Sequence, residues 1–490
     1  MAARLTQGWV TESRVPRALH GQGLCQWFAQ RVRTLEGASV LLLWHQALVL
    51  SAARPALWRE FANEAGSADE EMGLGLVDRI QAMEAEAAEC LAEMSGCRLM
   101  PAVIAELAAW IERPLQTPWE VVLRAMGLAR AIDARWGTEL PTLFQAATGS
   151  TAPLRLRGGW PAPRAEPPLR AMMRGRPLST RPDSLELCNL PQTHTDRLGL
   201  LRRRENAPGI RLHLADAGTP PWAETPLRVA VLVLRDAVGH SVQAMASSGG
   251  RFRVRVRGAA AAVAERLAAD VRTAADDGAA VLVMPELCSA REIHVRLDAT
   301  IAERERAGAP LPRLMVSGSR HVTTRGAGGE RRLRNRATLY VDGHAVLEHD
   351  KFNPVMISPQ KQEAIDTRRP TLSLYWHPSF SVAVAICKDL LHPGARDRLA
   401  DASPTFVLVP AWTPKAQPFE LVAAALLLQQ SITVVCNHVD EDADCDATPA
   451  AVMALPVRDD GHLIPLRGRS VVQGVWGCLT EGQRWERINR

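Results

Sequence analysis

From Leu227 onward, short β-branched runs alternate with a helical stretch, and this alternation restricts the possible folds more than any other feature of the chain. A run over residues 227–234 precedes helical periodicity over 259–276, and a second apolar run follows over 279–284. Strands that alternate with helices of this length are typical of a sheet covered by helices. We therefore predict an α/β domain over residues 227–490.

Two apolar runs in this region end in a reactive side chain. Pro285 follows the first run directly, and because proline cannot continue a central strand, the chain turns there and presents Glu286 at the carboxyl end of the strand. The apolar run over 381–386 ends in the same way at Cys387. Functional groups commonly lie at the carboxyl ends of strands in α/β sheets. Glu286 and Cys387 are therefore candidate catalytic residues.

Lysine is rare in this chain. Arginine supplies 54 of the 58 basic residues, and the four lysines all fall within one window of 65 residues: Lys351, Lys361, Lys388 and Lys415. Lysine offers a compact ammonium whose pKa responds to burial, which arginine does not. We therefore count Lys351 as a third candidate catalytic residue.

The order of these three candidates resembles the carbon–nitrogen hydrolase (nitrilase) superfamily over residues 227–440. Residues 278–287 are similar to the glutamate strand of that family, and residues 334–343 are similar to the strand and turn that precede its lysine. Residues 385–389 are similar to its cysteine elbow. The resemblance implies that the domain is a four-layer α-β-β-α sandwich.

Attack on an amide or nitrile carbon needs a thiolate, a proton acceptor and a group that stabilises the oxyanion. By the resemblance, Cys387 is the nucleophile that forms a thioester, and Glu286 is the base that takes its proton. We expect burial to raise the pKa of Glu286 toward neutrality, so that it can do this. Lys351 and the backbone N–H of Lys388 then stabilise the oxyanion.

Two further residues near this set have open interpretations. Glu363, twelve residues after Lys351, matches a second glutamate that orders the lysine and the substrate in the family. A surface carboxylate beside Lys361 is an equally good interpretation of Glu363. Lys388 departs from the family, in which tyrosine, tryptophan or glutamate usually follows the cysteine. A cation there could lower the pKa of the thiol, select an acidic substrate or face solvent.

Three classes of function are compatible with these residues. Hydrolysis of a non-peptide carbon–nitrogen bond is favoured, with an amide preferred to a nitrile, because residues 387–393 are more similar to amidase elbows than to nitrilase elbows. An acyl or ammonia transferase would use the same triad but needs an acceptor site. A non-catalytic binding or regulatory protein, for example in bacterial defence, is the third class. None of these classes requires a metal or an organic cofactor.

The first 226 residues have a different character. Residues 1–150 carry long apolar-periodic stretches without strand-like alternation, which predicts an all-α domain of unknown role. The apolar stretch over 38–53 is short for a membrane span, and we predict a buried helix there. Residues 151–226 hold 12 of the 33 prolines, and carry 12 arginines against seven acidic residues. We predict a basic, irregular connector for this range.

Partners and location follow from the same features. Arg202, Arg203 and Arg204 could contact phosphates, but a solvated linker is favoured because no nucleic-acid motif accompanies them. The family forms dimers by pairing its sandwiches, so we expect a homo-oligomer, with a small-molecule amide or nitrile as substrate. The helical region could dock a protein partner. Nine cysteines without regular spacing, and no apolar signal segment, favour the cytoplasm and no membrane attachment.

Overall fold

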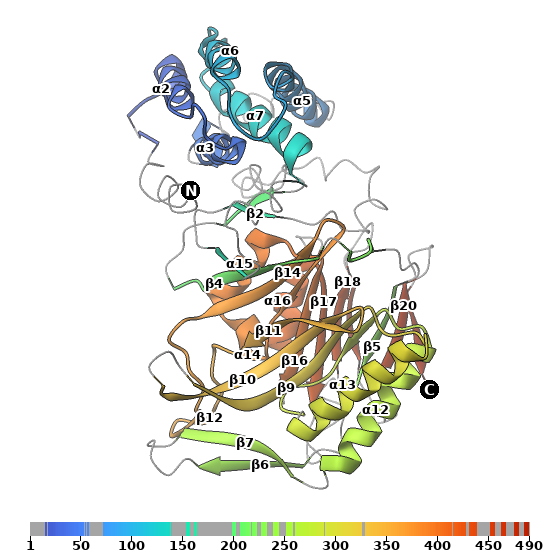
Figure 1. Cartoon of the computed structure of the whole chain (residues 1–490). Coiled ribbons are helices and arrows are strands. Elements are labelled where there is room, and N and C mark those ends of the chain that lie inside the picture. Colours follow the sequence, from blue (N-terminus) through green and yellow to red (C-terminus); the bar gives the residue numbers. More distant parts are fainter. Residues whose placement is uncertain are drawn as a thin grey trace. The chain divides into compact units, whose positions relative to one another are not determined.

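The computed structural model of the chain contains two compact units (Figure 1). The first unit comprises Met1–Ala152, Arg157–Glu166 and Ala171–Arg203, and the second comprises Pro153–Leu156, Pro167–Arg170 and Arg204–Arg490. The residues that the structure describes are 15–16, 18–52, 54, 56–57, 72–137, 139, 153–156, 161–163, 198–201, 206–216, 218–222, 227–232, 239–244, 251–257, 260–288, 290–325, 329–413, 415–427, 431–438, 451–455, 462–466, 475–479 and 485–489.

Helices form most of the described part of the first unit. They are α2 (Gly21–Arg33), α3 (Val40–Ala52), α5 (Met72–Cys90), α6 (Pro101–Glu112) and α7 (Glu120–Trp136). Their apolar side chains meet in one buried cluster that includes Trp44 and Trp110. The buried Arg124 guanidinium donates to the carbonyls of Ile111 and Pro114, and so satisfies carbonyl groups at the end of α6. A two-stranded antiparallel sheet of β2 (Pro161–Pro163) and β3 (Leu198–Leu200) also belongs to this unit.

The helix α3 lies within the apolar stretch for which a buried helix was predicted, and most of its side chains are buried. Across the described part of the chain, no helix combines the length and the apolar character needed to cross a membrane. Most of residues 151–226, including Arg202, Arg203 and Arg204, lie outside the described residues.

Two large mixed sheets form the centre of the second unit. The eight-stranded sheet has the order β1 (Leu154–Leu156), β4 (Gly209–Leu214), β14 (Thr371–His377), β15 (Phe380–Val384), β16 (Phe406–Trp412), β17 (Ile432–His438), β18 (Ala451–Leu455) and β19 (His462–Leu466). The seven-stranded sheet has the order β11 (His344–Asp350), β10 (Arg331–Val341), β9 (Leu314–Arg325), β8 (Val281–Val283), β5 (Leu227–Val231), β20 (Val475–Leu479) and β21 (Trp485–Asn489). The two sheets pack against each other through β8 and β9 on one side and β16 and β17 on the other.

Two strands of the eight-stranded sheet fall within the range predicted to be an irregular connector. β4 pairs in parallel with β14, and β1 pairs with β4 in turn. The β4 sequence alternates, with Ile210 and Leu212 buried, so its apolar face packs into the sandwich. For these residues the structure therefore differs from the predicted connector.

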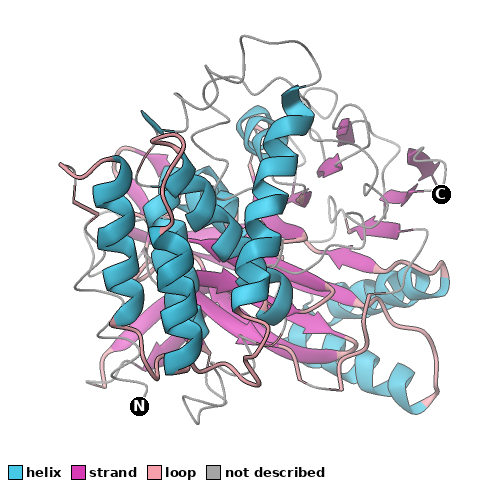
Figure 2. Ribbon diagram, turned by 90° about the horizontal axis from the view of Figure 1, so that it is seen from above, coloured by secondary structure: helices cyan, strands magenta, loops and turns pink. Residues whose placement is uncertain are grey.

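Helices lie on the outer faces of the two sheets. α12 (Ala260–Asp276) and α13 (Arg291–Arg306) cover the seven-stranded sheet, and their apolar side chains share a core with strands β5, β8 and β9. Figure 2 shows this pair against one side of the strands. On the eight-stranded sheet, α16 (Gln417–Leu427) packs against β17 and β18, with α14 (Lys388–Leu391) and α15 (Pro393–Ala402) beside it. The second unit is thus a mixed α/β structure with two inner sheets and two outer helix layers.

A smaller sheet adds to this sandwich. It has four strands in the order β12 (Met356–Ser358), β13 (Lys361–Glu363), β7 (Arg251–Arg257) and β6 (Gly239–Ala244). β13 and β7 run parallel, with Glu363 opposite Phe252. Segments far apart in the sequence are thereby brought together beside the carboxyl ends of the central strands.

Candidate active site

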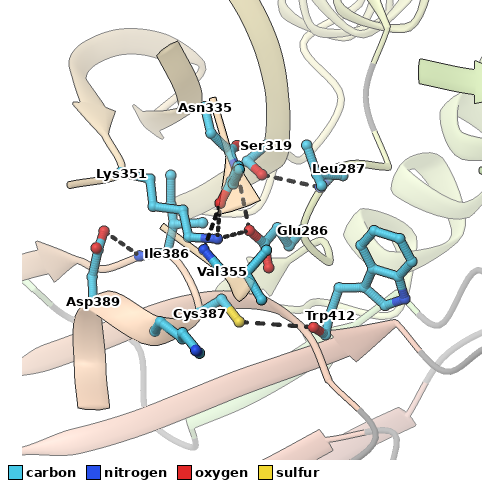
Figure 3. Close-up of polar contacts among 12 residues, drawn as sticks. Glu286, Leu287, Ser319, Asn335, Lys351, Val355, Ile386, Cys387, Asp389 and Trp412 are labelled. Atoms are coloured by element: carbon cyan, nitrogen blue, oxygen red, sulfur yellow. Dashed lines mark hydrogen bonds and ion pairs between the residues drawn. The ribbon is translucent and has the colours of Figure 1, made fainter. Parts of the chain in front are cut away.

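The structure brings the four side chains singled out by the sequence into one buried place. Glu286 follows β8, and Lys351 comes directly after β11. Glu363 is the last residue of β13, and Cys387 lies between β15 and α14. Figure 3 shows Glu286, Lys351 and Cys387 pointing toward one another. Parallel pairing explains part of this convergence, because β8 ends at the same edge as β5 and β9, and β15 ends at the same edge as β16.

The turn that carries Glu286 depends on a close backbone contact. Leu287 has a positive φ of 55°, and its N–H donates to Ser319 Oγ at 3.0 Å. Gly318 lies behind the turn with a φ of +73°, and a Cβ at this position would come within 2.6 Å of the Pro285 carbonyl oxygen and would overlap the Cys288 sulfur. Glycine is therefore needed at position 318 for both its conformation and its size.

The Lys351 ammonium lies between two carboxylates. Its Nζ donates to Glu286 Oε1 at 2.6 Å and to Glu363 Oε2 at 2.8 Å, and none of the three side chains is more than 2% exposed. Burial alone would lower the pKa of Lys351, but the charges of Glu286 and Glu363 raise it well above its usual value. The two carboxylates therefore favour the charged form of Lys351 inside the protein.

Glu363 is buried in this network and is not the surface carboxylate of the alternative interpretation. Besides Lys351, it accepts hydrogen bonds from His321 Nε2 at 2.9 Å, from Asn335 Nδ2 at 2.9 Å and from the Val355 N–H at 3.1 Å. Burial opposes ionisation, but the charges and hydrogen bonds of Lys351 and His321 hold the pKa of Glu363 well below its usual range. These interactions therefore favour the ionised form of Glu363.

Glu286 has the opposite tendency. Burial raises the pKa of its carboxyl group, the charge of Glu363 raises it further, and only Lys351 and hydrogen bonds oppose this. Asn335 Nδ2 bridges the two carboxylates, at 2.9 Å from Glu286 Oε1 and 2.9 Å from Glu363 Oε1. Two carboxyl groups with pKa values moved apart can take different roles in acid–base chemistry. Glu286 is the one that can accept a proton.

Cys387 lies in a strained turn. Its φ is +48° and its ψ is −113°, a backbone conformation that residues other than glycine rarely adopt. Its N–H donates to the Pro410 carbonyl at 2.8 Å, and its Sγ lies 3.8 Å from the Trp412 carbonyl oxygen. Burial and the Glu286 charge raise the pKa of this thiol, although Lys351 opposes them, so the resting residue is protonated.

Lys388 contributes its backbone to the site. Its side chain is half-buried, and its carbonyl oxygen accepts a hydrogen bond from Asn353 Nδ2 at 2.7 Å. Its N–H makes no hydrogen bond within the described part of the chain, so it is available to an oxyanion. The neighbouring charges that shift the pKa of Cys387 are those of Glu286 and Lys351. The interpretation in which Lys388 lowers this pKa stays a prediction.

Three polar residues of the site had no role in the sequence-based prediction: His321, Asn335 and Asp389. Asn335 and Asp389 are buried in the structure, but the sequence gives no local signal for either, because Asn335 stands between Arg334 and Arg336 and Asp389 follows Lys388. His321 gives no such signal, because it follows two polar residues on β9. All three become part of the site only through contacts between distant segments.

An apolar surface adjoins the charged groups. Phe252 and Val254 of β7 form a buried cluster with Leu287, and Val355 and Trp412 pack against it. Among the described residues, no group of three or more histidine, cysteine, aspartate or glutamate side chains is arranged to hold a metal ion. The arrangement therefore offers a thiol, a base, a fixed cation and an apolar wall.

Comparisons with known proteins give weak similarity. No family model matches the chain, and no curated protein matches its sequence. A solved structure of the Nesterenkonia AN1 amidase from the nitrilase superfamily has 15% identity and a TM-score of 0.35, over 52% of this chain and 92% of that one. A form of the Nesterenkonia sp. AN1 amidase with the acetamide moiety of fluoroacetamide on its active-site cysteine has 15% identity and a TM-score of 0.36, over 52% and 91%.

A third solved structure belongs to a larger protein. The glutamine-dependent NAD+ synthetase from Acinetobacter baumannii has 14% identity and a TM-score of 0.36, over 55% of this chain and 48% of that one. Similarity at this level does not assign the chain to a family. The structural neighbours of this mixed α/β chain thus include amidases of the nitrilase superfamily and an NAD+ synthetase, at low identity and over about half of its length.

Proposed function

We propose that the second unit hydrolyses a non-peptide carbon–nitrogen bond, an amide in preference to a nitrile, through a thioester on Cys387. One observation supports this above all. The Lys351 ammonium, two buried carboxylates whose pKa values are shifted in opposite directions, and a thiol in a strained turn converge on one place. This set supplies a nucleophile, a base and a cation for the oxyanion. With the residue pattern, it also supports membership of the carbon–nitrogen hydrolase superfamily.

In the first half of the proposed reaction, the Cys387 proton moves to Glu286 as sulfur attacks the amide carbon. The carbon–sulfur bond forms, and the resulting oxyanion accepts hydrogen bonds from Lys351 Nζ and the Lys388 N–H. Loss of one such donor costs roughly 3 to 4 kcal/mol of transition-state stabilisation in comparable sites. Glu286 then passes its proton to the amide nitrogen, the carbon–nitrogen bond breaks, and ammonia or an amine leaves.

Water completes the cycle in the second half. Glu286 takes a proton from water, the hydroxyl oxygen attacks the thioester carbon, and the carbon–sulfur bond breaks. The carboxylic acid leaves, and the proton on Glu286 returns to the sulfur. Glu363 remains ionised throughout, so Lys351 keeps its charge and its position while Glu286 gains and loses a proton.

Ammonia release from a panel of primary amides and matching nitriles tests this proposal with the full-length chain. We expect ammonia and carboxylic acid in equal amounts from the wild type and neither from Cys387→Ala. After acid quenching, peptide mass spectrometry should find the acyl group on Cys387. Cys436→Ala is a matched control, because that thiol is also buried but forms no part of the catalytic set.

Three outcomes count against the proposal. Equal ammonia release by the wild type and Cys387→Ala would remove the thiol from the chemistry. Absence of both turnover and an acyl adduct across the whole panel would exclude the proposed hydrolase activity. Faster turnover of a nitrile than of the matching amide would reverse the proposed substrate preference.

A further inference from the structure

We propose that His349 and Asp389 form a buried positioning pair that holds Lys351 and Cys387 in register with each other. His349 lies two residues before Lys351, and Asp389 lies two residues after Cys387. The proposal rests on the function proposed above for Lys351 and Cys387. It assigns no contact with substrate to the pair itself, which acts through the backbone that carries the two reacting groups.

One oxygen of Asp389 fixes the segment that follows Lys351. Oδ1 accepts hydrogen bonds from the N–H of Phe352 at 3.1 Å and from the N–H of Asn353 at 2.8 Å. These are the first two residues after Lys351, at the point where the chain leaves β11. Because both donors are backbone N–H groups, the carboxylate holds the main chain after Lys351 in place.

The second oxygen of Asp389 fixes the segment that precedes Cys387. Oδ2 accepts from the Ile386 N–H at 3.3 Å, a contact that Figure 3 shows, and it lies 3.0 Å from His349 Nε2. A carboxylate only accepts hydrogen bonds, so His349 Nε2 carries a proton. One carboxylate therefore joins both reacting segments, and His349 binds it from the strand that leads to Lys351.

Burial makes the loss of any hydrogen bond in this pair costly. Both side chains of the pair are completely buried, and a buried carboxylate that loses a donor is left with an uncompensated charge. The strained backbone of Cys387 also needs surrounding contacts to hold it. Without Asp389 the elbow could relax, and the thiol would move away from the Lys351 ammonium.

The same sandwich offers a control for the loss of a buried carboxylate. Asp401 in α15 is also buried, and its Oδ2 lies 3.6 Å from Nη1 of Arg398. Neither residue belongs to the segments that carry Lys351 and Cys387. Asp401→Asn should therefore lower stability in the way that Asp389→Asn does, without acting on the thiol.

The test is the pH dependence of Cys387 alkylation by iodoacetamide, read by peptide mass spectrometry, together with the thermal midpoint of each variant. For Asp389→Asn and His349→Leu we expect the profile to move to higher pH, because the ammonium stabilises the thiolate less. Alkylation near neutral pH should slow about tenfold, which corresponds to a shift of about one unit in the thiol pKa. His349→Gln should restore the wild-type profile, since a glutamine amide can donate from the position of Nε2.

Asp401→Asn should leave the profile unchanged and lower only the thermal midpoint. An unchanged profile in both Asp389→Asn and His349→Leu, with a loss of stability equal to that of Asp401→Asn, would overturn the positioning role. If Asp389→Asn does not fold, the comparison of His349→Leu with His349→Gln decides alone. Because alkylation needs no turnover, the result also stands apart from the outcome of the amide screen.

Discussion

Replacement of Lys351 by methionine removes the cation that two buried carboxylates share. Its Nζ lies 2.6 Å from Glu286 and 2.8 Å from Glu363, and the three side chains are almost fully buried. Methionine is similar in length and volume, so the loss is mainly electrostatic. Removing one partner of a buried ion pair costs about 3 to 5 kcal/mol. We expect the second unit of Lys351→Met to lose about this much stability at mildly alkaline pH.

The size of this loss should depend on pH, because the two carboxylates keep different donors. Glu363 still accepts hydrogen bonds from His321, Asn335 and Val355, whereas Glu286 keeps the hydrogen bond from the Asn335 amide. We therefore expect the already raised pKa of Glu286 to rise further in the variant. A carboxyl group whose folded pKa exceeds its unfolded value stabilises the fold below the unfolded pKa, and this stability is lost as pH rises through the folded pKa. The loss should thus be largest at alkaline pH and smaller in weak acid.

Hydrogen–deuterium exchange of peptides covering residues 281–288 and 380–391 measures this change within the second unit. Since each 1.4 kcal/mol is a factor of ten, a loss of about 3 to 5 kcal/mol predicts exchange more than a hundredfold faster than in the wild type. Lys361→Met is the matched control, because that lysine is exposed and lies ten residues further along the chain. Equal exchange in the two variants, or a difference that does not shrink as the pH is lowered, would refute the electrostatic account.

Three other predictions follow from the same contacts. Glu286→Gln should reduce the rate of ammonia release by a factor of about 10² to 10⁴. In the wild type, kcat/KM should fall as the pH drops through the pKa of Glu286, which lies above its ordinary value of 4.5. A kcat/KM that does not fall even below pH 4.5 would contradict the role of Glu286 as the base. Lys388→Met should leave the pH profile of Cys387 alkylation unchanged, and an upward shift would show that the Lys388 cation activates the thiol. Arg313→Met removes a buried guanidinium that donates to the Pro220 carbonyl, and the thermal midpoint should fall by the equivalent of about 1 to 3 kcal/mol, whereas an unchanged midpoint would mean that this contact contributes nothing.

The strands that lead to Glu286 and Cys387 could be located from apolar runs, but the exact end of the second could not. The predicted helix over 259–276 matches α12 within one residue, and the run over 279–284 contains β8. The predicted strand over 381–386 ends earlier, at Val384. The N–H groups of Ala385 and Cys387 still donate to β16, whereas the Ile386 N–H between them donates to the Asp389 side chain. Runs of apolar residues carry no information on such a contact.

The position of Glu363 shows a second limit. The strand β13 is only three residues long, and its first two residues are exposed, so nothing local distinguishes Glu363 from a surface carboxylate. Its burial depends on Lys351, His321 and Asn335, which come from three other segments. The alternation of arginine with apolar residues over Arg251–Arg257 indicates a strand. It does not indicate that the apolar face of this strand packs against Leu287, next to Glu286. Tertiary contacts supply what the local pattern lacks.

The resting state of the thiol follows from the same electrostatics. The Glu286 charge raises the pKa of Cys387, so while Glu286 is ionised the site disfavours a thiolate. Once the proton has moved to Glu286, that repulsion is gone and the Lys351 ammonium faces the sulfur without competition from Glu286. In the proposed reaction, a single proton transfer therefore converts a site that disfavours the thiolate into one that stabilises it. On this reasoning Cys387 should react with iodoacetamide at neutral pH more slowly than a solvent-exposed thiol. It should still react faster than the thiol of Cys436, which is also buried. A rate equal to that of Cys436 would mean that proton transfer to Glu286 does not occur.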